Sequence, residues 1–293
     1  MFFLESPADE VSPGHRNAIV TVLVGQAYVE TWRVMCEANW RAYAERWGFD
    51  LIVIAHLPDA SPRGRGRSPA WQKLLVLDQP WSGAYERIVW IDADIVIAAH
   101  APDILREVPD PANVGASLSG AQFSEAEKHI YFERLHNLMV EPQLAPLAWR
   151  FTEENGFSES EIDGEGAPML NTGVLVMSPQ HHNGLLLEIY ASESASRLYE
   201  QPLLSREIHR AGLLVPITPR FNWVIHERRI LDFAEIETVE HPEVWRLINH
   251  LRNELSKAYF LHFAGSMSIM QHLAHLSQET GEPWWKAQRP ASA

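Results

Sequence analysis

A strand, a helix and a second strand occupy residues 18–55 in that order, and this order limits the fold more than any other feature. Residues 18–24 are an apolar, β-branched run that predicts a buried strand ended by Gly25. Residues 50–55 predict the second strand, and the segment between them predicts a helix ended by Gly48. Its core-facing stripe is formed by Val29, Trp32, Cys36, Trp40, Tyr43 and Trp47. A strand–helix–strand unit implies neighbouring parallel strands, so we expect an α/β fold.

Two aspartates interrupt the next apolar run. Residues 87–97 have the composition of a buried strand, yet they contain Asp92 and Asp94. Residues i and i+2 of a strand point to the same face, with Cα atoms about 6–7 Å apart. Both carboxylates can then reach one hard cation such as Mg²⁺ or Mn²⁺, which suits a diphosphate ligand. A pair of solvated acids in a turn is the alternative that these two residues alone leave open.

Composition narrows the class of protein. With 293 residues, 46% hydrophobic and 21% charged, the chain is large enough for one α/β domain with additions. No apolar stretch approaches the roughly 20 residues of a membrane span, and acids near the N-terminus do not fit a signal peptide. We therefore expect a cytoplasmic protein without a transmembrane segment. The net charge of -14 disfavours nucleic acid as a partner, and the lone Cys36 excludes an internal disulfide.

Further elements are predicted on both sides of the aspartates. The expected helices cover residues 70–79, 124–140 and 184–210, and the expected strands cover 114–118, 169–177, 213–217 and 258–262. Ser124 and Glu127 fit a capping box at the start of the second of these helices. Residues 141–166 are expected to form an irregular acidic insertion.

An arginine-bearing loop precedes the first of these helices. Residues 58–69 are rich in Pro, Gly and Ser and contain Arg63, Arg65 and Arg67. We expect either a solvated, mobile loop or a flexible arm that folds over a phosphate.

Several functional motifs are missing from the sequence. There is no Gly-x-x-x-x-Gly-Lys phosphate loop, and the turn after Gly25 lacks the glycines of a dinucleotide fingerprint. His226-Glu227 is not followed by the second histidine of a zinc protease motif. His272 and His275 could share a helical face, but no third zinc ligand is near them in sequence, so ordinary surface histidines are favoured. The missing phosphate loop argues against an ATPase, and the missing dinucleotide fingerprint argues against a dehydrogenase.

One alternative keeps the aspartates at its centre. The segment Asp92-Ala-Asp-Ile-Val96 resembles the opening motif of haloacid-dehalogenase-type phosphohydrolases, which would make Asp92 a nucleophile. That motif usually opens the first strand of its domain, whereas a strand–helix–strand unit precedes it here. The Asp-Asp pair that holds magnesium later in that family is also missing from this sequence.

The order of the motifs resembles another family more closely. Trp71-Gln-Lys73 precedes the aspartates, and Asn171-Thr-Gly-Val174, Glu200-Gln-Pro-Leu-Leu204 and His262-Phe-Ala-Gly265 follow them. This series resembles the metal-dependent, retaining glycosyltransferases of the A-type (GT-A) fold. Similar groups are the glycogenin and lipopolysaccharide galactosyltransferases and the related galactosyl-, mannosyl- and xylosyltransferases. The motifs span about residues 18–265, which is most of the chain.

The resemblance implies a fold and a domain organisation. It implies one GT-A domain over residues 1–293, the nucleotide-diphospho-sugar transferase fold, with a Rossmann-like, mostly parallel central sheet flanked by helices. Residues 17–97 would form the nucleotide-binding half. Residues 98–293 would form the acceptor-binding half and carry a C-terminal metal-ligand strand and helix.

The resemblance also implies a metal site. Asp94 would bind Mn²⁺ or Mg²⁺ directly, and Asp92 would share the metal or hold the ribose. His262 would be the third protein ligand, and Gly265 would let the backbone approach the diphosphate. A divalent ion held in this way stabilises the charge that develops on a departing nucleoside diphosphate.

Further residues receive roles from the same resemblance. Glu200 and Gln201 would face the anomeric carbon as the catalytic pair, and Lys73 would assist the diphosphate. The remaining positions would contact the base, the sugar or the acceptor: Val24, Gly25, Tyr28, Asn171, Thr172 and Gly173. Four tryptophans are loose candidates for stacking on carbohydrate: Trp149, Trp223, Trp284 and Trp285.

The resemblance implies transfer of a sugar from a nucleotide diphosphate sugar, with a UDP-sugar as the expected donor, to a carbohydrate or another hydroxyl acceptor, with retention at the anomeric carbon. Two departures from the family pattern affect details. Glu200 stands where relatives often have Asp, and Ser266 follows Gly265 where relatives continue to a Lys-Pro-Trp. A phosphohydrolase and a non-catalytic protein that binds sugar nucleotides or glycans remain the alternatives.

Overall fold

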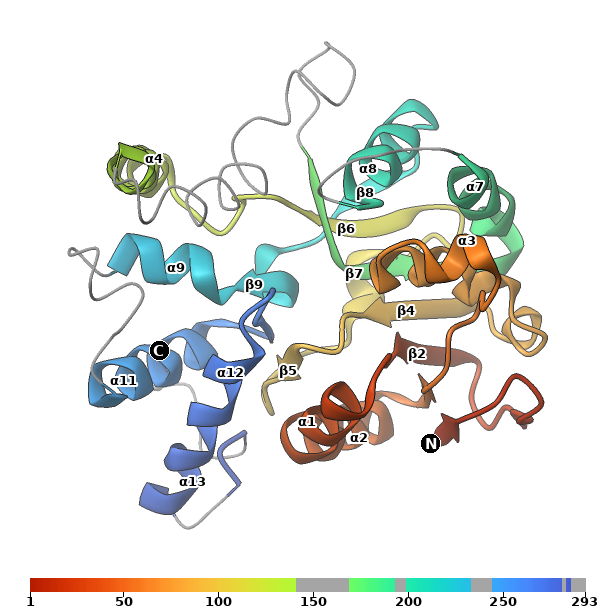
Figure 1. The fold of residues 1–293 in the computed structure, drawn as a ribbon, viewed down its shortest axis with the longest axis horizontal. Coiled ribbons are helices and arrows are strands. Elements are labelled where there is room, and N and C mark those ends of the chain that lie inside the picture. Colours follow the sequence, from red (N-terminus) through yellow and green to blue (C-terminus); the bar gives the residue numbers. More distant parts are fainter. Residues whose placement is uncertain (141–168, 193–198, 233–243, 281–282, 286–293) are drawn as a thin grey trace.

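The computed structural model describes residues 1–140, 169–192, 199–232, 244–280 and 283–285 (Figure 1). The predicted acidic insertion over 141–166, including Trp149, lies outside these residues. Within them, no helix combines the length and the apolar character needed to cross a membrane.

A large and a small sheet organise the chain. The seven-stranded sheet has the order β1-β3-β2-β4-β7-β6-β8, and the three-stranded sheet has the order β5-β10-β9. The strands are β1 (Phe2–Leu4), β2 (Asn17–Val22), β3 (Phe49–Ile54), β4 (Arg87–Ile91), β5 (Ile95–Ile97), β6 (Val114–Leu118), β7 (Leu170–Met177), β8 (Leu214–Pro216), β9 (Trp223–Val224) and β10 (Phe260–His262).

The large sheet is mostly parallel. Strands β1, β3, β2 and β4 pair in parallel, and so do β6 and β8. Strand β7 runs antiparallel to both β4 and β6. The predicted α/β fold with a mostly parallel central sheet is therefore confirmed. Strand β1 was not predicted, because a run of three apolar residues carries no recognisable period.

Helices flank both faces of the large sheet. The α-helices are α1 (Gln26–Met35), α2 (Glu37–Trp47), α3 (Pro62–Arg65), α4 (Glu125–Val140), α7 (Pro179–Ala191), α8 (Gln201–Arg210), α9 (Ile225–Asp232), α11 (Val244–Lys257), α12 (Met267–Met270) and α13 (Ala274–Thr280). The 3₁₀ helices are η1 (Pro69–Asp78), η2 (Ser82–Ala84), η3 (Ile104–Glu107), η4 (Pro219–Asn222) and η5 (Gln271–Leu273). Ser124 and Glu127 form the predicted capping box before α4.

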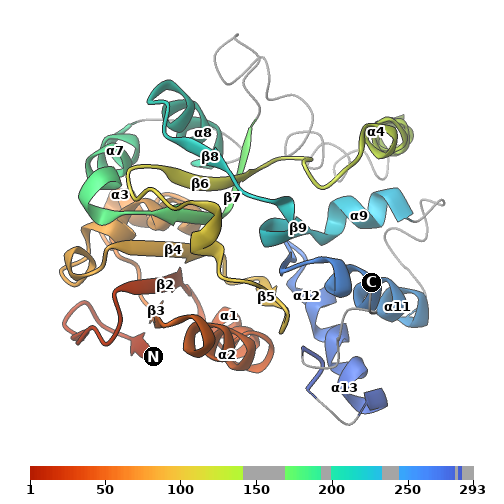
Figure 2. The ribbon, with the colours of Figure 1, turned by 180° about the vertical axis from the view of Figure 1, so that it is seen from behind.

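Alternating strand residues divide the core between the two faces. Ile19, Val89 and Ile91 pack into a cluster with α1 and α2, which also includes residues of α11, η5 and α13. Their sequence neighbours Val20 and Ile88 face a second cluster with η1, α7 and α8. Figures 1 and 2 show α1 and α2 on one side of the large sheet and α7 and α8 on the other. Because both faces are covered, the central strands are almost continuously apolar.

The chain changes sheets at the two aspartates. Strand β4 ends at Ile91 in the large sheet, and β5 begins at Ile95 in the small one. The prediction of one strand over residues 87–97 is therefore wrong at residues 92–94, which form a turn. The turn is held by the Asp92 N–H, which donates to the Gly173 carbonyl at 2.8 Å. Both carboxylates thereby escape full burial inside a sheet.

Two predicted helices are divided. The helix after β2 breaks at Cys36 into α1 and α2, although the predicted stripe still faces the core. The helix predicted over 184–210 is two helices, α7 and α8, because Tyr199 has a left-handed backbone conformation with φ 59° and Pro202 lies in the first turn of α8. The helix predicted over residues 70–79 is the 3₁₀ helix η1, which ends at Asp78.

Two glycines provide a matched test of the backbone geometry. Gly48 ends α2 with φ 71°, where an added Cβ has room but the backbone conformation is strained for an L-residue. Gly184 lies inside α7, and a Cβ there meets nothing within 4 Å. We expect Gly48→Ala to lower the free energy of unfolding by about 1–2 kcal/mol, and Gly184→Ala to raise it by about 0.5–1 kcal/mol. Urea denaturation measures both; changes of the same sign would contradict these assignments.

Candidate functional site

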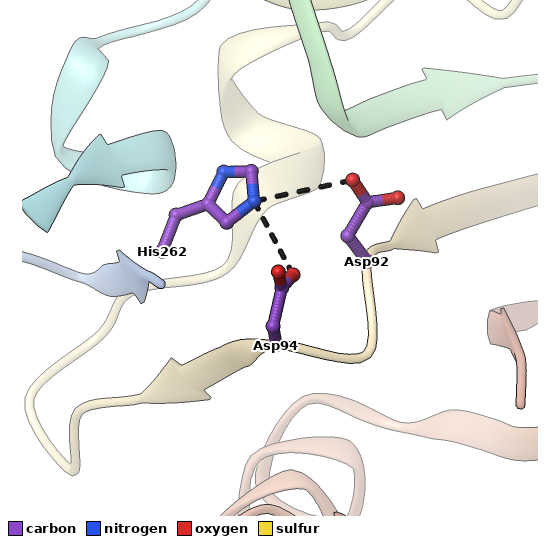
Figure 3. A group of neighbouring side chains, drawn as sticks. All are labelled: Asp92, Asp94 and His262. Atoms are coloured by element: carbon purple, nitrogen blue, oxygen red, sulfur yellow. Dashed lines mark ion pairs between the residues drawn. The ribbon is translucent and has the colours of Figure 1, made fainter. Parts of the chain in front are cut away.

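Asp92, Asp94 and His262 come together at the junction of the two sheets. The aspartates lie in the turn between β4 and β5, and His262 is the last residue of β10. His262 Nε2 lies 3.3 Å from Asp94 Oδ1 and 4.0 Å from Asp92 Oδ2 (Figure 3). One potential ligand atom from each residue lies within 4.8 Å of the others. Two carboxylate oxygens and one imidazole nitrogen form a donor set that fits Mn²⁺ or Mg²⁺.

The backbone sets this geometry. Strand β10 runs antiparallel to β5 with His262 opposite Ile95, and the Phe263 N–H donates to the Asp94 carbonyl at 2.9 Å. Gly173 lies against the imidazole, since a Cβ at this position would be 2.5 Å from His262 Cε1. The absence of a side chain at Gly173 is therefore what admits the ring.

Charge couples Asp94 to His262. Burial would raise the pKa of the Asp94 carboxyl, but the His262 imidazolium and its hydrogen bond, with the Gly265 N–H, hold that pKa below its ordinary value. Burial would lower the pKa of His262, but the Asp94 and Asp92 carboxylates raise it. A divalent cation at this site would replace the proton on Nε2.

Lys73 is a buried cation beside the same site. Its side chain is 3% exposed, and Nζ lies 2.9 Å from Glu200 Oε1 and 3.2 Å from Asp92 Oδ1. Nζ also donates to the Thr172 carbonyl at 3.1 Å. Burial would lower the pKa of Lys73, but the two carboxylates raise it, so the amine stays charged. Lys73 is therefore a buried, paired cation and not a solvated helix residue.

Glu200 and Gln201 are brought into the site by hydrogen bonds to Thr172 of β7. Glu200 is buried, and its Oε1 accepts a hydrogen bond of 2.9 Å from Thr172 Oγ1. Gln201 Oε1 lies 3.4 Å from the Thr172 N–H. In the part of the chain that the structure describes, no donor reaches Glu200 Oε2. This oxygen is thus a buried acceptor whose hydrogen-bonding capacity is unused among the described residues.

Asn222, a residue that the sequence did not single out, connects Asn171 to His262. Asn222, the last residue of η4, donates from Nδ2 to Asn171 Oδ1 at 2.9 Å, and its Oδ1 lies 2.8 Å from His262 Nδ1. The sequence around Asn222 has no motif that we could recognise. Only the pairing of β9 with β10 brings it to His262.

The predicted base-contacting residues lie at the same edge of the large sheet. Val24, Gly25 and Tyr28 follow the carboxyl end of β2, which is next to β4, and Asp92 follows the carboxyl end of β4. Gly25 has φ 99° at the start of α1, and the Tyr28 side chain is 52% exposed. Gly265, with φ 62°, follows β10, and its N–H bonds to the Asp94 carboxylate.

Two arginines of the predicted arginine-bearing loop bond to the end of α7. The Arg63 guanidinium donates to the carbonyl of Ala191 at 2.5 Å, and Arg67 donates to that of Tyr190 at 2.6 Å. Arg67 also lies over the Trp71 ring, at 4.3 Å from its centroid. Guanidinium groups are favoured at the carbonyl end of a helix. Arg63 and Arg65 are exposed, whereas Arg67 is half-buried.

A second cluster of possible metal ligands is already paired with basic side chains. Asp232, His250 and Glu254 have ligand atoms within 4.8 Å of one another. However, Glu254 is paired with Lys257 Nζ at 2.5 Å and Arg228 Nε at 3.3 Å. These cations favour a structural ion-pair network over a metal site.

Comparisons with known proteins give similarity in solved structures only. No family model matches the sequence, and no curated protein matches it. A glycosyltransferase involved in the glycosylation of the major capsid of PBCV-1 is 11% identical, with 87% of this chain and 98% of that chain covered and a TM-score of 0.49.

Two other solved structures are similar over most of their length. The galactosyltransferase LgtC, in complex with donor and acceptor sugar analogues, is 11% identical, with 93% of this chain and 98% of that chain covered and a TM-score of 0.46. Mouse xyloside xylosyltransferase 1 in its apo form is 12% identical, with 84% and 97% covered and a TM-score of 0.38. At such low identities and TM-scores, function has to be inferred from the geometry of the site.

The Lys73–Glu200 pair can be tested by stability. Lys73→Met leaves the buried Glu200 carboxylate without its cation, and we expect a loss of about 3–5 kcal/mol in the free energy of unfolding. The double variant Lys73→Met/Glu200→Leu removes both charges and should lose less than Lys73→Met alone. Lys128, paired with Glu125 at the surface, is the matched control; Lys128→Met should change stability by less than about 1 kcal/mol.

Urea denaturation in the presence of EDTA measures these variants. Equal losses for Lys73→Met and Lys128→Met would contradict a buried ion pair at Lys73.

Proposed function

We propose that this chain is a metal-dependent glycosyltransferase that moves a sugar from a nucleotide diphosphate sugar to a hydroxyl acceptor. The observation that supports this most is the cluster of Asp92, Asp94 and His262 at the carboxyl edge of the parallel strands, with the buried Lys73–Glu200 pair beside it. In open α/β sheets, ligands bind outside the carboxyl ends of the strands.

The cation site faces the donor phosphates in this proposal. Asp94 and His262 hold Mn²⁺ or Mg²⁺, and Asp92 shares the ion or binds the ribose. When bound, the cation neutralises the negative charge that develops on the departing nucleoside diphosphate. Gly265, which has no side chain and a positive φ, lets the backbone approach the diphosphate.

The nucleotide lies across the carboxyl ends of β2 and β4. The exposed ring of Tyr28 offers a surface on which a base can stack, while Val24 and Gly25 contact its edge. UDP-sugars are the expected donors. Residues 17–97 thus form the nucleotide-binding half of one domain, and residues 98–293 form the acceptor-binding half.

The sugar lies between β7 and the start of α8. Asn171, Thr172 and Gly173 line this side, and Glu200 Oε2 accepts a hydrogen bond from a sugar hydroxyl. Gln201 faces the anomeric carbon together with Glu200. Lys73 is paired with Glu200 at 2.9 Å and fixes the position of its carboxylate, and in this proposal the diphosphate is bound by the cation.

Retention at the anomeric carbon and a carbohydrate acceptor are parts of the same proposal. The longer side chain of Glu200, compared with the Asp of relatives, reaches Lys73 from the start of α8. The cytoplasmic location expected from the sequence stays a prediction.

A phosphohydrolase is not favoured by the surroundings of Asp92. A nucleophilic carboxylate needs an oxygen that is free to attack phosphorus. Asp92 Oδ1 accepts hydrogen bonds from Trp90 Nε1 at 2.7 Å and is paired with Lys73, while Oδ2 faces His262. Oδ1 is thus already used in hydrogen bonding and ion pairing, and Oδ2 lies 4.0 Å from His262 Nε2, on the side where it can share a cation with Asp94 and His262.

Release of nucleoside diphosphate from a panel of nucleotide sugars tests the proposal. With Mn²⁺ present, we expect release from at least one UDP-sugar and its loss on addition of EDTA. Asp94→Ala and His262→Ala should each lower the rate by about 100-fold or more, because the developing charge loses its stabilising cation. Asp78→Ala and His181→Ala, exposed residues on η1 and α7, serve as matched controls and should leave the rate unchanged.

Three results would count against the proposal. Release that is insensitive to EDTA would remove the metal from the mechanism. Metal-dependent release of phosphate from simple phosphoesters would favour the phosphohydrolase. Tight binding of a nucleotide sugar without turnover, in the presence of a range of acceptor sugars, would favour a binding protein.

A further inference from the structure

We propose that Asn222 is a positioning residue that holds His262 as the tautomer protonated at Nδ1, so that the lone pair of Nε2 faces Asp92 and Asp94. Asn222 has no role in the function proposed above. The effect of Asn222 on metal binding rests on that proposed function, whereas its effect on the tautomer does not.

The fold delivers Asn222 to the far side of the imidazole ring. Asn222 is buried and ends η4, and β9 follows it directly. Strand β9 pairs in parallel with β10, with Val224 opposite His262. Asn222 Oδ1 therefore lies 2.8 Å from His262 Nδ1, on the side of the ring away from the carboxylates.

Two backbone groups decide which way the Asn222 amide points. The Gly173 N–H can only donate, and it lies 3.0 Å from the Asn171 side-chain oxygen, which fixes that oxygen as Oδ1. The Asn171 backbone carbonyl can only accept, and it lies 3.2 Å from Asn222. Asn222 therefore presents its NH₂ group to both oxygens of Asn171, at 2.9 Å and 3.2 Å.

The orientation of the amide then decides the tautomer of the imidazole. With its NH₂ group directed at Asn171, Asn222 has only its Oδ1 left for His262, and an amide oxygen can only accept. Nδ1 must therefore carry a proton. The opposite amide orientation would place Oδ1 against two acceptor oxygens of Asn171, which is unfavourable in a buried site.

The remaining ring nitrogen is the one that faces the carboxylates. Nε2 lies 3.3 Å from Asp94 Oδ1, and Gly173 packs against the ring on its Cε1 side. A rotation of the ring by half a turn would exchange the Nδ1 hydrogen bond for a C–H contact. A histidine whose second nitrogen donates to a fixed oxygen is a better metal ligand, because its orientation and basicity are both set in advance.

Nitrogen chemical shifts of the histidine ring test the tautomer directly. The protein is labelled with ¹⁵N-histidine, kept free of metal, and recorded at an alkaline pH at which the imidazole is neutral; the His262 signals are identified with His262→Gln. We expect a protonated Nδ1 and a bare Nε2 in the unaltered protein. Asn222→Ala should shift both signals toward a mixture of tautomers. Asn222→Asp keeps an acceptor for Nδ1–H and should retain the original pattern, although its second carboxylate oxygen faces the two acceptor oxygens of Asn171 and should lower the free energy of unfolding.

Two outcomes of this measurement would overturn the inference. One is a protonated Nε2 in the unaltered protein. The other is an unchanged tautomer in Asn222→Ala, where thermal denaturation shows that this variant is folded. If Asn222→Ala does not fold, the nitrogen shifts of Asn222→Asp are used instead. Loss of the Nδ1 proton in Asn222→Asp would contradict the role of Asn222.

Calorimetric titration with Mn²⁺ alone tests the consequence. Asn222→Ala should weaken Mn²⁺ binding by about 10-fold to 100-fold. Asn183→Ala is the matched control, because Asn183 bonds to Asp78 on the surface formed by α7 and η1 and should leave the affinity unchanged. If the unaltered protein binds no Mn²⁺, the proposed function fails, and the nitrogen shifts still decide the role of Asn222. If the metal binds equally well to Asn222→Ala, the inference fails and the proposed function stands.

Discussion

The antiparallel pairing of β5 with β10 is the constraint on which the rest of the site depends. It consists of three residue pairs, and it places His262 opposite Ile95, directly after Asp94. The same small sheet brings Asn222 to the other side of the imidazole through β9. Without this pairing, Asp92 and Asp94 would be two acids in an ordinary turn. A short contact between segments far apart in sequence thus turns a surface feature into a candidate metal site.

The balance of charge explains why a divalent cation suits this place. Asp92, Asp94 and Glu200 bring three carboxylates, and Lys73 brings one permanent positive charge. When His262 is neutral, two negative charges remain, and one divalent ion offsets them. Without the ion, the proton on His262 offsets one of them, which agrees with its raised pKa. In the proposed function, Lys73 would stabilise the sugar side of the site and the cation would stabilise the phosphate side.

The apolar periodicity of the sequence predicted the elements whose structure depends on residues close together in the chain. The strand–helix–strand unit at 18–55 and the positions of Asp92, Asp94 and His262 at strand ends could be read from apolar periodicity and from the resemblance to known motifs. The break at residues 92–94 could not, because β5 leaves the large sheet only through its pairing with β10. Asn222 and the burial of Lys73 were missed for the same reason, since both depend on partners distant in sequence.

Anomalous diffraction from crystals grown with Mn²⁺ and a nucleoside diphosphate tests the central claim most directly. We expect one strong manganese peak, about 2.1 Å from an oxygen of Asp94 and bound to His262 Nε2. Asp92 should either bind the same ion or contact the ribose. The diphosphate oxygens should complete its coordination. A nucleotide bound without manganese at these residues, or manganese bound elsewhere on the chain, would contradict the account.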